Sequence, residues 1–309
     1  MQIIRHLDAL NSSLSGGAVS IGNFDGVHLG HAHIARQLAA QAKQYGGPAI
    51  VFTFDPHPIH LLRPEEILPP LTWTDRKAQL LAEQGVDILL AYPTDAALLA
   101  LSPHDFFAQI VLGRLAPRGM VEGDNFRFGR GRAGDMALLR KLTAENGLDL
   151  DVISAVQFEN SPVSSTRIRQ LLSEGAIQAA AELLTQPYRL RGIVAHGAGR
   201  GGPLGFPTAN LEALDTLLPA PGVYAGRGFR QEKVWPAAIH IGPNPTFADA
   251  TAKVEVHLIG CDETLYGSRL EVDFLTRLRD IERFSDAAAL KRQLALDVEK
   301  TRCVAAGDV

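Results

Sequence analysis

Cysteine is almost absent from this chain of 309 residues, and its two cysteines, Cys261 and Cys303, have no paired spacing. This excludes a disulfide framework and indicates free thiols in a reducing compartment. No apolar run is long enough to span a bilayer. Arg5, His6 and Asp8 stand where a signal peptide would need apolar residues. We therefore expect a cytoplasmic protein with no membrane partner.

An excess of charge of either sign is also lacking, because the net charge is only −4. A chain without a basic excess is not expected to bind nucleic acid in general. Hydrophobic residues make up 46% of the sequence, so the chain can bury a sizeable core and form two domains. We expect domains at 1–184 and 185–309, joined near Thr185-Gln186-Pro187. The oligomeric state is left open.

Two familiar nucleotide-binding signatures are missing, since no Walker A sequence and no protein-kinase signature occurs. Two glycine patterns imitate a dinucleotide fingerprint. At 129–134 a loop separates the pattern from the preceding strand, and at 197–202 Pro203 and more loop follow where a helix is required. Both are rejected, so the nucleotide sites have to be sought in other segments.

The first half of the chain alternates strand patterns with helix patterns. Strands are predicted at 18–21, 49–54, 86–92, 120–122 and 150–156. Helices are predicted at 30–44, 74–84, 134–145 and from 102. This alternation predicts an α/β domain with a doubly wound parallel sheet of about five strands, closed by two short helices ending near 184. Ligands of such sheets bind beyond the carboxyl ends of the strands.

The segment V-S-I-G-N-F-D-G-V-H-L-G-H, Val19 to His31, joins the first of these strands to a helix. Free backbone N–H groups and the positive end of the helix dipole favour a phosphate there. His28 and His31 can donate hydrogen bonds to phosphoryl oxygens and, when protonated, offset developing charge. Two plainer alternatives are a pair of surface histidines and a zinc site with His33. No further zinc ligand lies nearby at ligand spacing.

Three other segments follow predicted strands. Phe54-Asp55-Pro56-His57-Pro58 is a restricted turn with an aromatic ring and an imidazole. In 123–129 two phenylalanines can stack on a planar ring, and the arginines beyond them can meet phosphates. In 163–169 hydroxyls at a helix start precede two arginines, which favours a second anion site. An ordinary proline turn and a plain capping cluster are the structural alternatives.

The second half of the chain reads differently, because strand patterns follow one another with glycine and proline turns. The predicted strands are 188–196, 222–229, 234–241, 253–259 and 269–275. A helix with one apolar face follows from about 285. This predicts an antiparallel β-barrel with a C-terminal helix. Val254 and Val256 flank Glu255, so if both valines face the core, Glu255 points outward.

Taken together, the motifs resemble those of bacterial bifunctional riboflavin kinases/FMN adenylyltransferases. His28-Leu29-Gly30-His31 resembles the (H/T)-x-G-H signature of nucleotidyltransferases. The glycine-rich 196–211, with Pro207-Thr208-Ala209-Asn210, resembles riboflavin kinases, as do 242–247 and the strand around Glu255. The resemblance implies a Rossmann-like nucleotidyltransferase domain followed by a β-barrel riboflavin kinase domain. It also implies two reactions, phosphorylation of riboflavin to FMN and adenylylation of FMN to FAD, both with ATP.

The resemblance further implies roles for individual residues. The catalytic residues would be His28, His31 and Glu255. ATP and its phosphates would contact Gly22, Phe24, Gly30, Ser164, Ser165, Thr166, Arg167, Arg169, Gly199, Arg200, Gly205 and Pro207. The flavin would contact Asn23, Phe54, His57, Asn125, Phe126 and Phe128. Mg²⁺, arriving with ATP, would be held by Thr208 and Asn210.

Three features depart from the pattern of that family, and one of them is Thr185-Gln186, which stands before Pro187 where Gly-Arg is common. Gly202 stands where a second arginine is frequent, and His240 stands where an asparagine is usual. Two alternatives remain open at this point. One is a flavin- or nucleotide-binding protein with only one active module, and the other is a nucleotidyltransferase acting on a different phosphorylated substrate.

Overall fold

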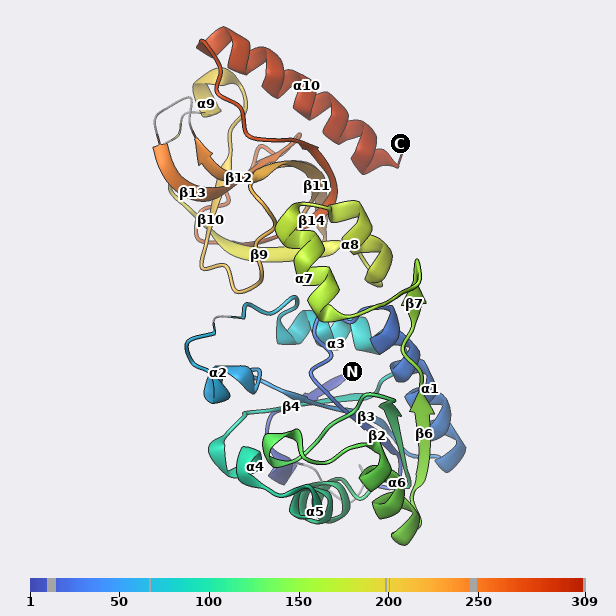
Figure 1. The fold of residues 1–309 in the computed structure, drawn as a ribbon. Helices are drawn as coiled ribbons and strands as arrows, with labels where there is room; N and C mark the ends of the chain where they lie inside the picture. Colours follow the sequence, from blue (N-terminus) through green and yellow to red (C-terminus); the bar gives the residue numbers. More distant parts are fainter. Residues whose placement is uncertain (10–14, 67, 198, 200, 245–248, 308–309) are drawn as a thin grey trace. The chain divides into compact units, whose positions relative to one another are not determined.

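The computed structural model describes residues 1–9, 15–66, 68–197, 199, 201–244 and 249–307. The chain divides into two compact units, Met1–Ser165 and Thr166–Val309 (Figure 1). We expected a domain boundary between 184 and 185, which would separate two functional domains rather than two compact units. That boundary stays a prediction.

The first unit is built on a parallel sheet with strand order β1-β4-β3-β2-β5-β6. Its strands are β1 (Gln2–Ile4), β2 (Ala18–Ile21), β3 (Ala49–Phe54), β4 (Ile88–Tyr92), β5 (Gly119–Gly123) and β6 (Asp149–Ile153). The predicted parallel sheet is confirmed, and the short edge strand β1 is an addition. The chain leaves β2 first towards β3 and later returns to β5 on its other side. This makes the gap between β2 and β5 the switch point of the sheet.

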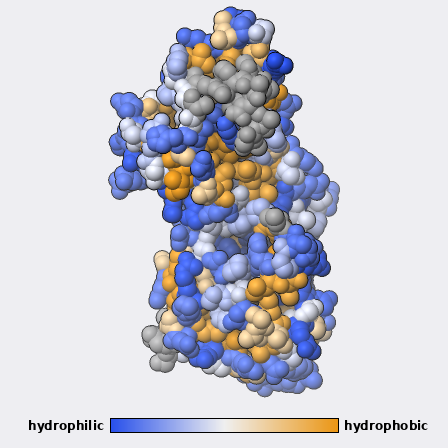
Figure 2. Space-filling view, turned by 90° about the vertical axis from the view of Figure 1, so that its left-hand side faces the viewer, coloured by the Kyte–Doolittle hydropathy of each residue, from blue (hydrophilic) through white to orange (hydrophobic). Residues whose placement is uncertain are grey.

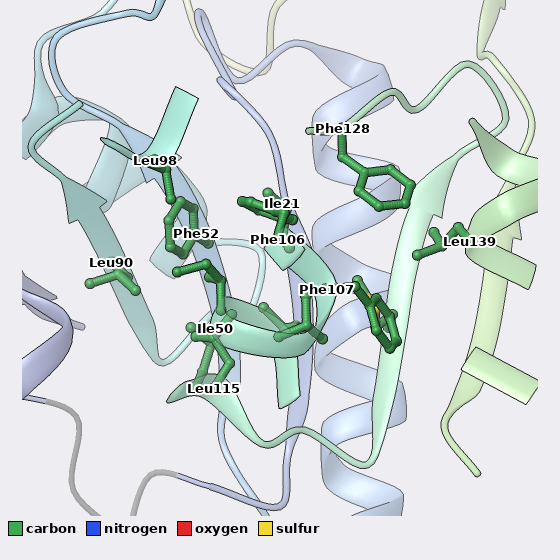
Figure 3. Close-up of a cluster of buried hydrophobic side chains, with 14 of the residues drawn as sticks. Ile21, Ile50, Phe52, Leu90, Leu98, Phe106, Phe107, Leu115, Phe128 and Leu139 are labelled. Carbon is green, nitrogen blue, oxygen red and sulfur yellow. The ribbon is translucent and has the colours of Figure 1, made fainter. Parts of the chain in front are cut away.

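Helices cover both faces of this sheet. On one face α1 (Leu29–Tyr45) and α3 (Thr74–Ala82) bury residues such as Leu38 and Leu81 against the strands. On the other face five residues labelled in Figure 3 pack on the strands, namely Leu98, Phe106, Phe107, Leu115 and Leu139. They come from α4 (Ala96–Ala100), α5 (Pro103–Phe106), the π-helix η3 (Phe107–Leu115) and α6 (Met136–Glu145). This two-sided burial explains why most residues of the central strands are apolar.

Short elements connect these helices and strands. They are η1 (Leu7–Ala9), α2 (Ile59–Leu62), η4 (Arg130–Arg132), β7 (Gln157–Phe158) and β8 (Ser161–Pro162). The three glycines of the rejected fingerprint lie before, within and after η4, at Gly129, Gly131 and Gly134. A Cβ at Gly134 would lie 2.7 Å from the Phe128 ring, so this glycine serves core packing.

The second unit contains a closed antiparallel barrel with strand order β10-β13-β12-β11-β14-β9. Its strands are β9 (Tyr188–Ala195), β10 (Ala209–Glu212), β11 (Gly222–Arg230), β12 (Lys233–Asn244), β13 (Asp249–Leu258) and β14 (Arg269–Arg279). The predicted barrel is confirmed. The sequence prediction left β10 in the glycine-rich loop, because four residues after a proline carry too little pattern to identify a strand.

Helices pack on the outside of the barrel. These are α7 (Ser165–Glu174), α8 (Ile177–Leu183) and the C-terminal α10 (Ala287–Ala306). The backbone of α7 is tied to the unit by Ala220 N–H, which donates to Leu172 O at 2.9 Å. The helix α10 is clamped by Arg279, whose guanidinium contacts both carboxylate oxygens of the buried Asp297. This clamp fixes the predicted C-terminal helix to β14.

The exposed surface is mixed in character. On the face drawn in Figure 2, hydrophobic residues form patches among hydrophilic ones. Large hydrophobic side chains with more than half of their surface exposed include Leu62, Val234 and Tyr266.

Candidate functional site

The turn after β2 has an unusual backbone. Phe24 and Val27 have positive φ angles of 47° and 42° although neither is a glycine, and Val27 is fully buried. A positive φ is rare for a bulky residue and unfavourable for a β-branched one, so the surrounding structure must impose it. Such imposed strain is typical of functional sites.

Asp25 holds this turn in place. Its carboxylate accepts hydrogen bonds from the backbone N–H groups of Leu71 and Thr72 at 2.9 and 3.2 Å. Its backbone carbonyl accepts from the hydroxyl of Ser165 at 2.9 Å. A carboxylate that accepts several backbone N–H bonds stabilises the loop that donates them. Asp25 therefore joins the turn to the segments on either side of it.

His28 and His31 lie together where α1 begins. Their rings are stacked, with centroids 3.6 Å apart. His28 is the N-cap residue, and its Nδ1 accepts from the backbone N–H of His31 at 3.3 Å. A neutral His28 therefore carries its proton on Nε2, which leaves Nε2–H as the donor. At Gly30 a Cβ would lie 3.1 Å from the His28 ring, so the lack of a side chain at this position leaves room for the ring.

Burial makes both histidines neutral at pH 7. It lowers the pKa of His28 from 6.5 to about 4, although nearby Asp25 acts in the opposite direction. It lowers the pKa of His31 well below 6.5, and the charges of His28 and Lys77 act in the same direction. The two imidazoles thus offer neutral hydrogen bonds rather than positive charge.

Lys77 of α3 is the buried cation of this site, and the sequence analysis did not identify it. Its Nζ donates to the backbone carbonyl of Asn23 at 2.7 Å and contacts the Thr53 hydroxyl at 3.4 Å. Burial lowers its pKa, while Asp25 and Asp55 act to raise it. Its spacing in the sequence could have identified it. Leu80 and Leu81 are buried and follow Lys77 by three and four residues, so Lys77 lies on the apolar face of its helix.

Asn23 and His57 come from different loops and meet at the ends of β2 and β3. The Asn23 amide nitrogen lies 2.7 Å from His57 Nε2. The ring is fixed from its other side, because Ile59 N–H donates to Nδ1 at 3.1 Å. Phe54, the last residue of β3, is partly buried and packs against the core beside Phe52. Asn23 and His57, two of the predicted flavin residues, are therefore in direct contact.

The switch point itself holds a buried acid that the sequence analysis did not identify. Residues 18 and 19 of β2 pair with β5, but the ladder stops there. Beyond it, the Glu122 carboxylate accepts from Ile21 N–H at 2.7 Å and so replaces the missing backbone pairing. Burial raises the pKa of Glu122 well above its ordinary value, which favours the protonated carboxyl.

The segment after β5 brings the predicted Asn125, Phe126 and Phe128 to the same edge. Asn125 is exposed and Phe126 partly buried, whereas Phe128 is only 5% exposed. The two phenyl rings stack on each other at 5.6 Å, and Phe128 lies in the core (Figure 3). Phe126 therefore presents more surface to a ligand than Phe128 does.

The predicted second anion segment is divided between the two units. Ser164 and Ser165 belong to the first, where Ser165 contacts the turn through Asp25. Thr166, Arg167 and Arg169 continue into α7 in the second. The roles of these five residues stay predictions.

In the barrel, Glu255 faces outward as the alternation predicts. Its neighbours Val254 and Val256 are buried in the core, while the Glu255 side chain is 20% exposed. Directly opposite Glu255 on β10 is Asn210, so the two share the outer face. The structure thus brings together one predicted catalytic residue and one predicted metal ligand.

The glycine-rich segment lies beside this pair. A Cβ at Gly197 would overlap the Asn210 amide, so only glycine permits this approach. Contrary to the expected continuous loop, residues 201–204 form one helical turn, α9 (Gly201–Leu204), closed by Phe206 N–H on Gly201 O. One turn is still too short for a dinucleotide fingerprint.

The remaining predicted residues of this segment lie around the turn. Gly205 has a φ of 90° and follows α9, and the carbonyl of Pro207 lies 2.7 Å from Nδ1 of His257. Gly199 and Thr208 are exposed. Arg200 lies outside the described residues, as does the second half, 245–247, of the predicted turn at 242–247.

Comparison with known proteins gives a concordant result for both halves. The family described as FAD synthetase matches residues 10–167, and the family described as riboflavin kinase matches residues 184–305. A bifunctional riboflavin kinase/FMN adenylyltransferase of Escherichia coli (strain K12) is 35% identical over 302 residues, covering 96% of each chain. The protein of the same name from Pseudomonas fluorescens is 35% identical over 307 residues, covering 99% of this chain and 98% of its own.

A solved structure shares the fold along nearly the whole chain. It is titled as a macrolide-efflux protein from Streptococcus pneumoniae, and it matches with a TM-score of 0.87 and 30% identity. The match covers 97% of this chain and 98% of that one. Among the described helices of this chain, none is long and apolar enough to cross a membrane.

A parallel-sheet unit with a histidine pair at its switch-point helix, followed by a barrel with an outward Asn–Glu pair, defines a two-module nucleotide-dependent transferase. The chain belongs to the family of bifunctional riboflavin kinases/FMN adenylyltransferases. Enzymes of this family use ATP to phosphorylate riboflavin and then to adenylylate the resulting FMN, which yields FAD and pyrophosphate.

Proposed function

We propose that this chain phosphorylates riboflavin in its barrel, with Glu255 as the general base. The observation that carries this assignment is the direct cross-strand pairing of Glu255 with Asn210 on the outer face of the barrel. The riboflavin hydroxyl attacks the γ-phosphorus of ATP, its proton passes to the Glu255 carboxylate, and ADP leaves. A carboxylate is needed because this hydroxyl is a poor nucleophile at neutral pH.

Mg²⁺ is part of the same proposal. The Thr208 hydroxyl and the Asn210 amide oxygen are hard oxygen donors of the kind that this ion prefers. Within the described residues no group of three or more His, Cys, Asp or Glu side chains could hold a metal ion. We therefore propose that the ion comes with ATP, whose phosphate charge it offsets when bound. The exposed Gly199 and the turn at Gly205 and Pro207 would contact the phosphates, as would Arg200.

In the first unit FMN is adenylylated. A phosphate oxygen of FMN attacks the α-phosphorus of ATP, and pyrophosphate leaves. His28 Nε2–H and the neutral His31 donate hydrogen bonds to the phosphoryl oxygens, at the positive end of the α1 dipole. The buried Lys77 adds a positive charge beneath the turn, so the site favours anions although its histidines are neutral.

The other predicted residues complete the two sites. The backbone at Gly22, Phe24 and Gly30 borders the ATP phosphates, and Ser164, Ser165, Thr166, Arg167 and Arg169 bind the pyrophosphate. Asn23, His57, Phe54, Asn125, Phe126 and Phe128 form the flavin side. The adenylyltransferase module would span 1–184 and the kinase module 185–309, in a cytoplasmic protein without a nucleic-acid partner. Fluorescence microscopy of a tagged chain checks the location.

Glu255→Gln tests the kinase assignment. The amide is nearly isosteric but accepts no proton, so riboflavin phosphorylation should slow by roughly 10²-fold or more, as expected for a lost general base. The measurement is the rate of FMN formation from riboflavin, ATP and Mg²⁺, resolved by chromatography. FAD synthesis from supplied FMN is the internal control and should not change. Riboflavin phosphorylation at the wild-type rate would show that Glu255 is only a surface carboxylate.

A further inference from the structure

A histidine lies directly beside the proposed base. In the barrel, β12 and β13 are antiparallel neighbours, and their register places His240 opposite Glu255. On the other side of Glu255 the register places Asn210. The three side chains therefore form one row across three strands on the outer face, because directly opposed residues of a sheet point to the same side.

The contact between the two side chains is close and sheltered. His240 Nδ1 lies 3.7 Å from Glu255 Oε2. Both side chains are about four-fifths buried, with 19% and 20% of their surface exposed. His240 Nδ1 is itself buried and has no hydrogen-bond partner among the described residues. A buried polar nitrogen without a partner is uncommon and calls for an explanation.

We propose that His240 is a positioning residue for Glu255 in riboflavin phosphorylation. A small rotation of either side chain brings Nδ1 and Oε2 within hydrogen-bond distance, and the imidazole N–H then holds the carboxylate at one orientation. A base that is held in place transfers a proton more efficiently than one that samples several rotamers, since catalysis requires hydrogen-bond geometry. This proposal rests on the proposed role of Glu255.

A double-mutant cycle separates positioning from a structural effect. It compares the wild-type enzyme, His240→Ala, Glu255→Gln and the double variant by kcat and KM for riboflavin. If His240 acts through the base, His240→Ala should lower kcat roughly tenfold with less than about a twofold change in KM. In the Glu255→Gln background the same change should alter kcat by less than about twofold, because the base is already lost.

A conservative variant provides the rescue. The amide nitrogen of asparagine stands at the same distance along the side chain as Nδ1, whereas that of glutamine stands at the distance of Nε2. His240→Asn should therefore recover most of the wild-type kcat, and His240→Gln should recover less. The matched control is Val234→Ala on the same strand, a position 53% exposed, which should leave kcat unchanged.

The outcomes are distinct. Three results would each overturn the proposal. The first is an equal loss of kcat from His240→Ala in the wild-type and Glu255→Gln backgrounds, and the second is a wild-type kcat for His240→Ala. The third is a kcat of His240→Asn no higher than that of His240→Ala. Those results leave Glu255 as the base if Glu255→Gln is inactive. A fully active Glu255→Gln enzyme instead overturns the proposed function and the role of His240 with it. Urea unfolding followed by Trp235 fluorescence in a Trp73→Phe background shows that the barrel unit of each variant is folded.

Discussion

At the residue scale, burial decides the charge of the groups in the first unit. The sequence alone assigns ordinary pKa values to His28, His31 and Glu122, yet burial lowers the pKa of both histidines and raises that of Glu122, which favours the neutral form of each. The cause is the same in each case, because a buried group loses the hydration that favours its charged form. This has consequences for stability as well as for catalysis.

The first consequence concerns acid stability. The folded pKa of His28 is about 4 and its ordinary value is 6.5, so only the unfolded chain binds this proton between those values. Stability that is fully present above pH 6.5 is therefore lost as the pH falls towards 4, by about 3 kcal/mol from His28 alone. The measurement is urea unfolding between pH 7 and 4.5, followed by Trp73 fluorescence in a Trp235→Phe background.

The control for this prediction is His28→Asn. Asparagine can still accept the hydrogen bond from His31 N–H as an N-cap residue, but it does not titrate. Its unfolding free energy should fall less steeply with decreasing pH than that of the wild type. Equal slopes in the two proteins would mean that His28 titrates normally in the folded state.

The second consequence concerns Glu122, whose pKa is shifted in the opposite direction. The folded chain keeps a proton that the unfolded chain releases above the ordinary pKa, so this group makes stability fall as the pH rises. Glu122→Gln keeps the shape without titrating and should be as stable as the wild type at pH 7, or more stable. Glu122→Ala leaves Ile21 N–H without its acceptor and should cost ~1–3 kcal/mol. Urea unfolding at pH 7 compares the two, and a glutamine variant as unstable as the alanine one would contradict a raised pKa of Glu122.

At the scale of elements, two aspartates of α10 should differ sharply in importance. Asp286 caps the helix by accepting from Ala289 N–H at 2.8 Å and is exposed. Asp297 lies in the middle of the helix, is 2% exposed and pairs with Arg279 through both carboxylate oxygens. Removing one partner of a buried pair costs about 3–5 kcal/mol, which exceeds the loss from removing an exposed helix cap.

We therefore expect Asp297→Ala to destabilise the barrel unit several times more than Asp286→Ala. Urea unfolding monitored by Trp235 in a Trp73→Phe background measures both values in this unit. If the two variants lose the same free energy, the clamp between Arg279 and Asp297 contributes no more than an ordinary cap.

At the scale of the whole molecule, the two activities should be separable. The histidine pair and the Asn–Glu pair belong to different compact units with separate cores. His28→Ala should abolish FAD formation, because the donor to the phosphoryl oxygen is lost, with a drop of at least ~10²-fold. FMN production from riboflavin should continue near the wild-type rate. Chromatography of flavins from one reaction mixture measures both, and loss of both activities in a folded variant would refute two independent sites.

The sequence alone determined the order of most strands and helices and the two fold types. These follow from local properties, since alternation, helical periodicity and turn residues are properties of neighbouring positions. The segment from Gly22 to His31 was identified in the same way, whereas the family and the role of Glu255 followed from the resemblance of motifs. Val254 and Val256 correctly predicted the outward direction of Glu255, because strand alternation is a short-range rule.

Only the tertiary structure decided which residues meet and which are charged. Lys77 lies 54 positions from Asn23 and Glu122 lies 101 positions from Ile21, yet each pair is hydrogen-bonded. His240 and Glu255 are neighbours only because β12 and β13 pair in one register, which a shift by one residue would undo. The neutral histidines likewise result from burial, which depends on segments distant in the chain. Partners, register and desolvation are non-local, and so they appear only when the chain is folded.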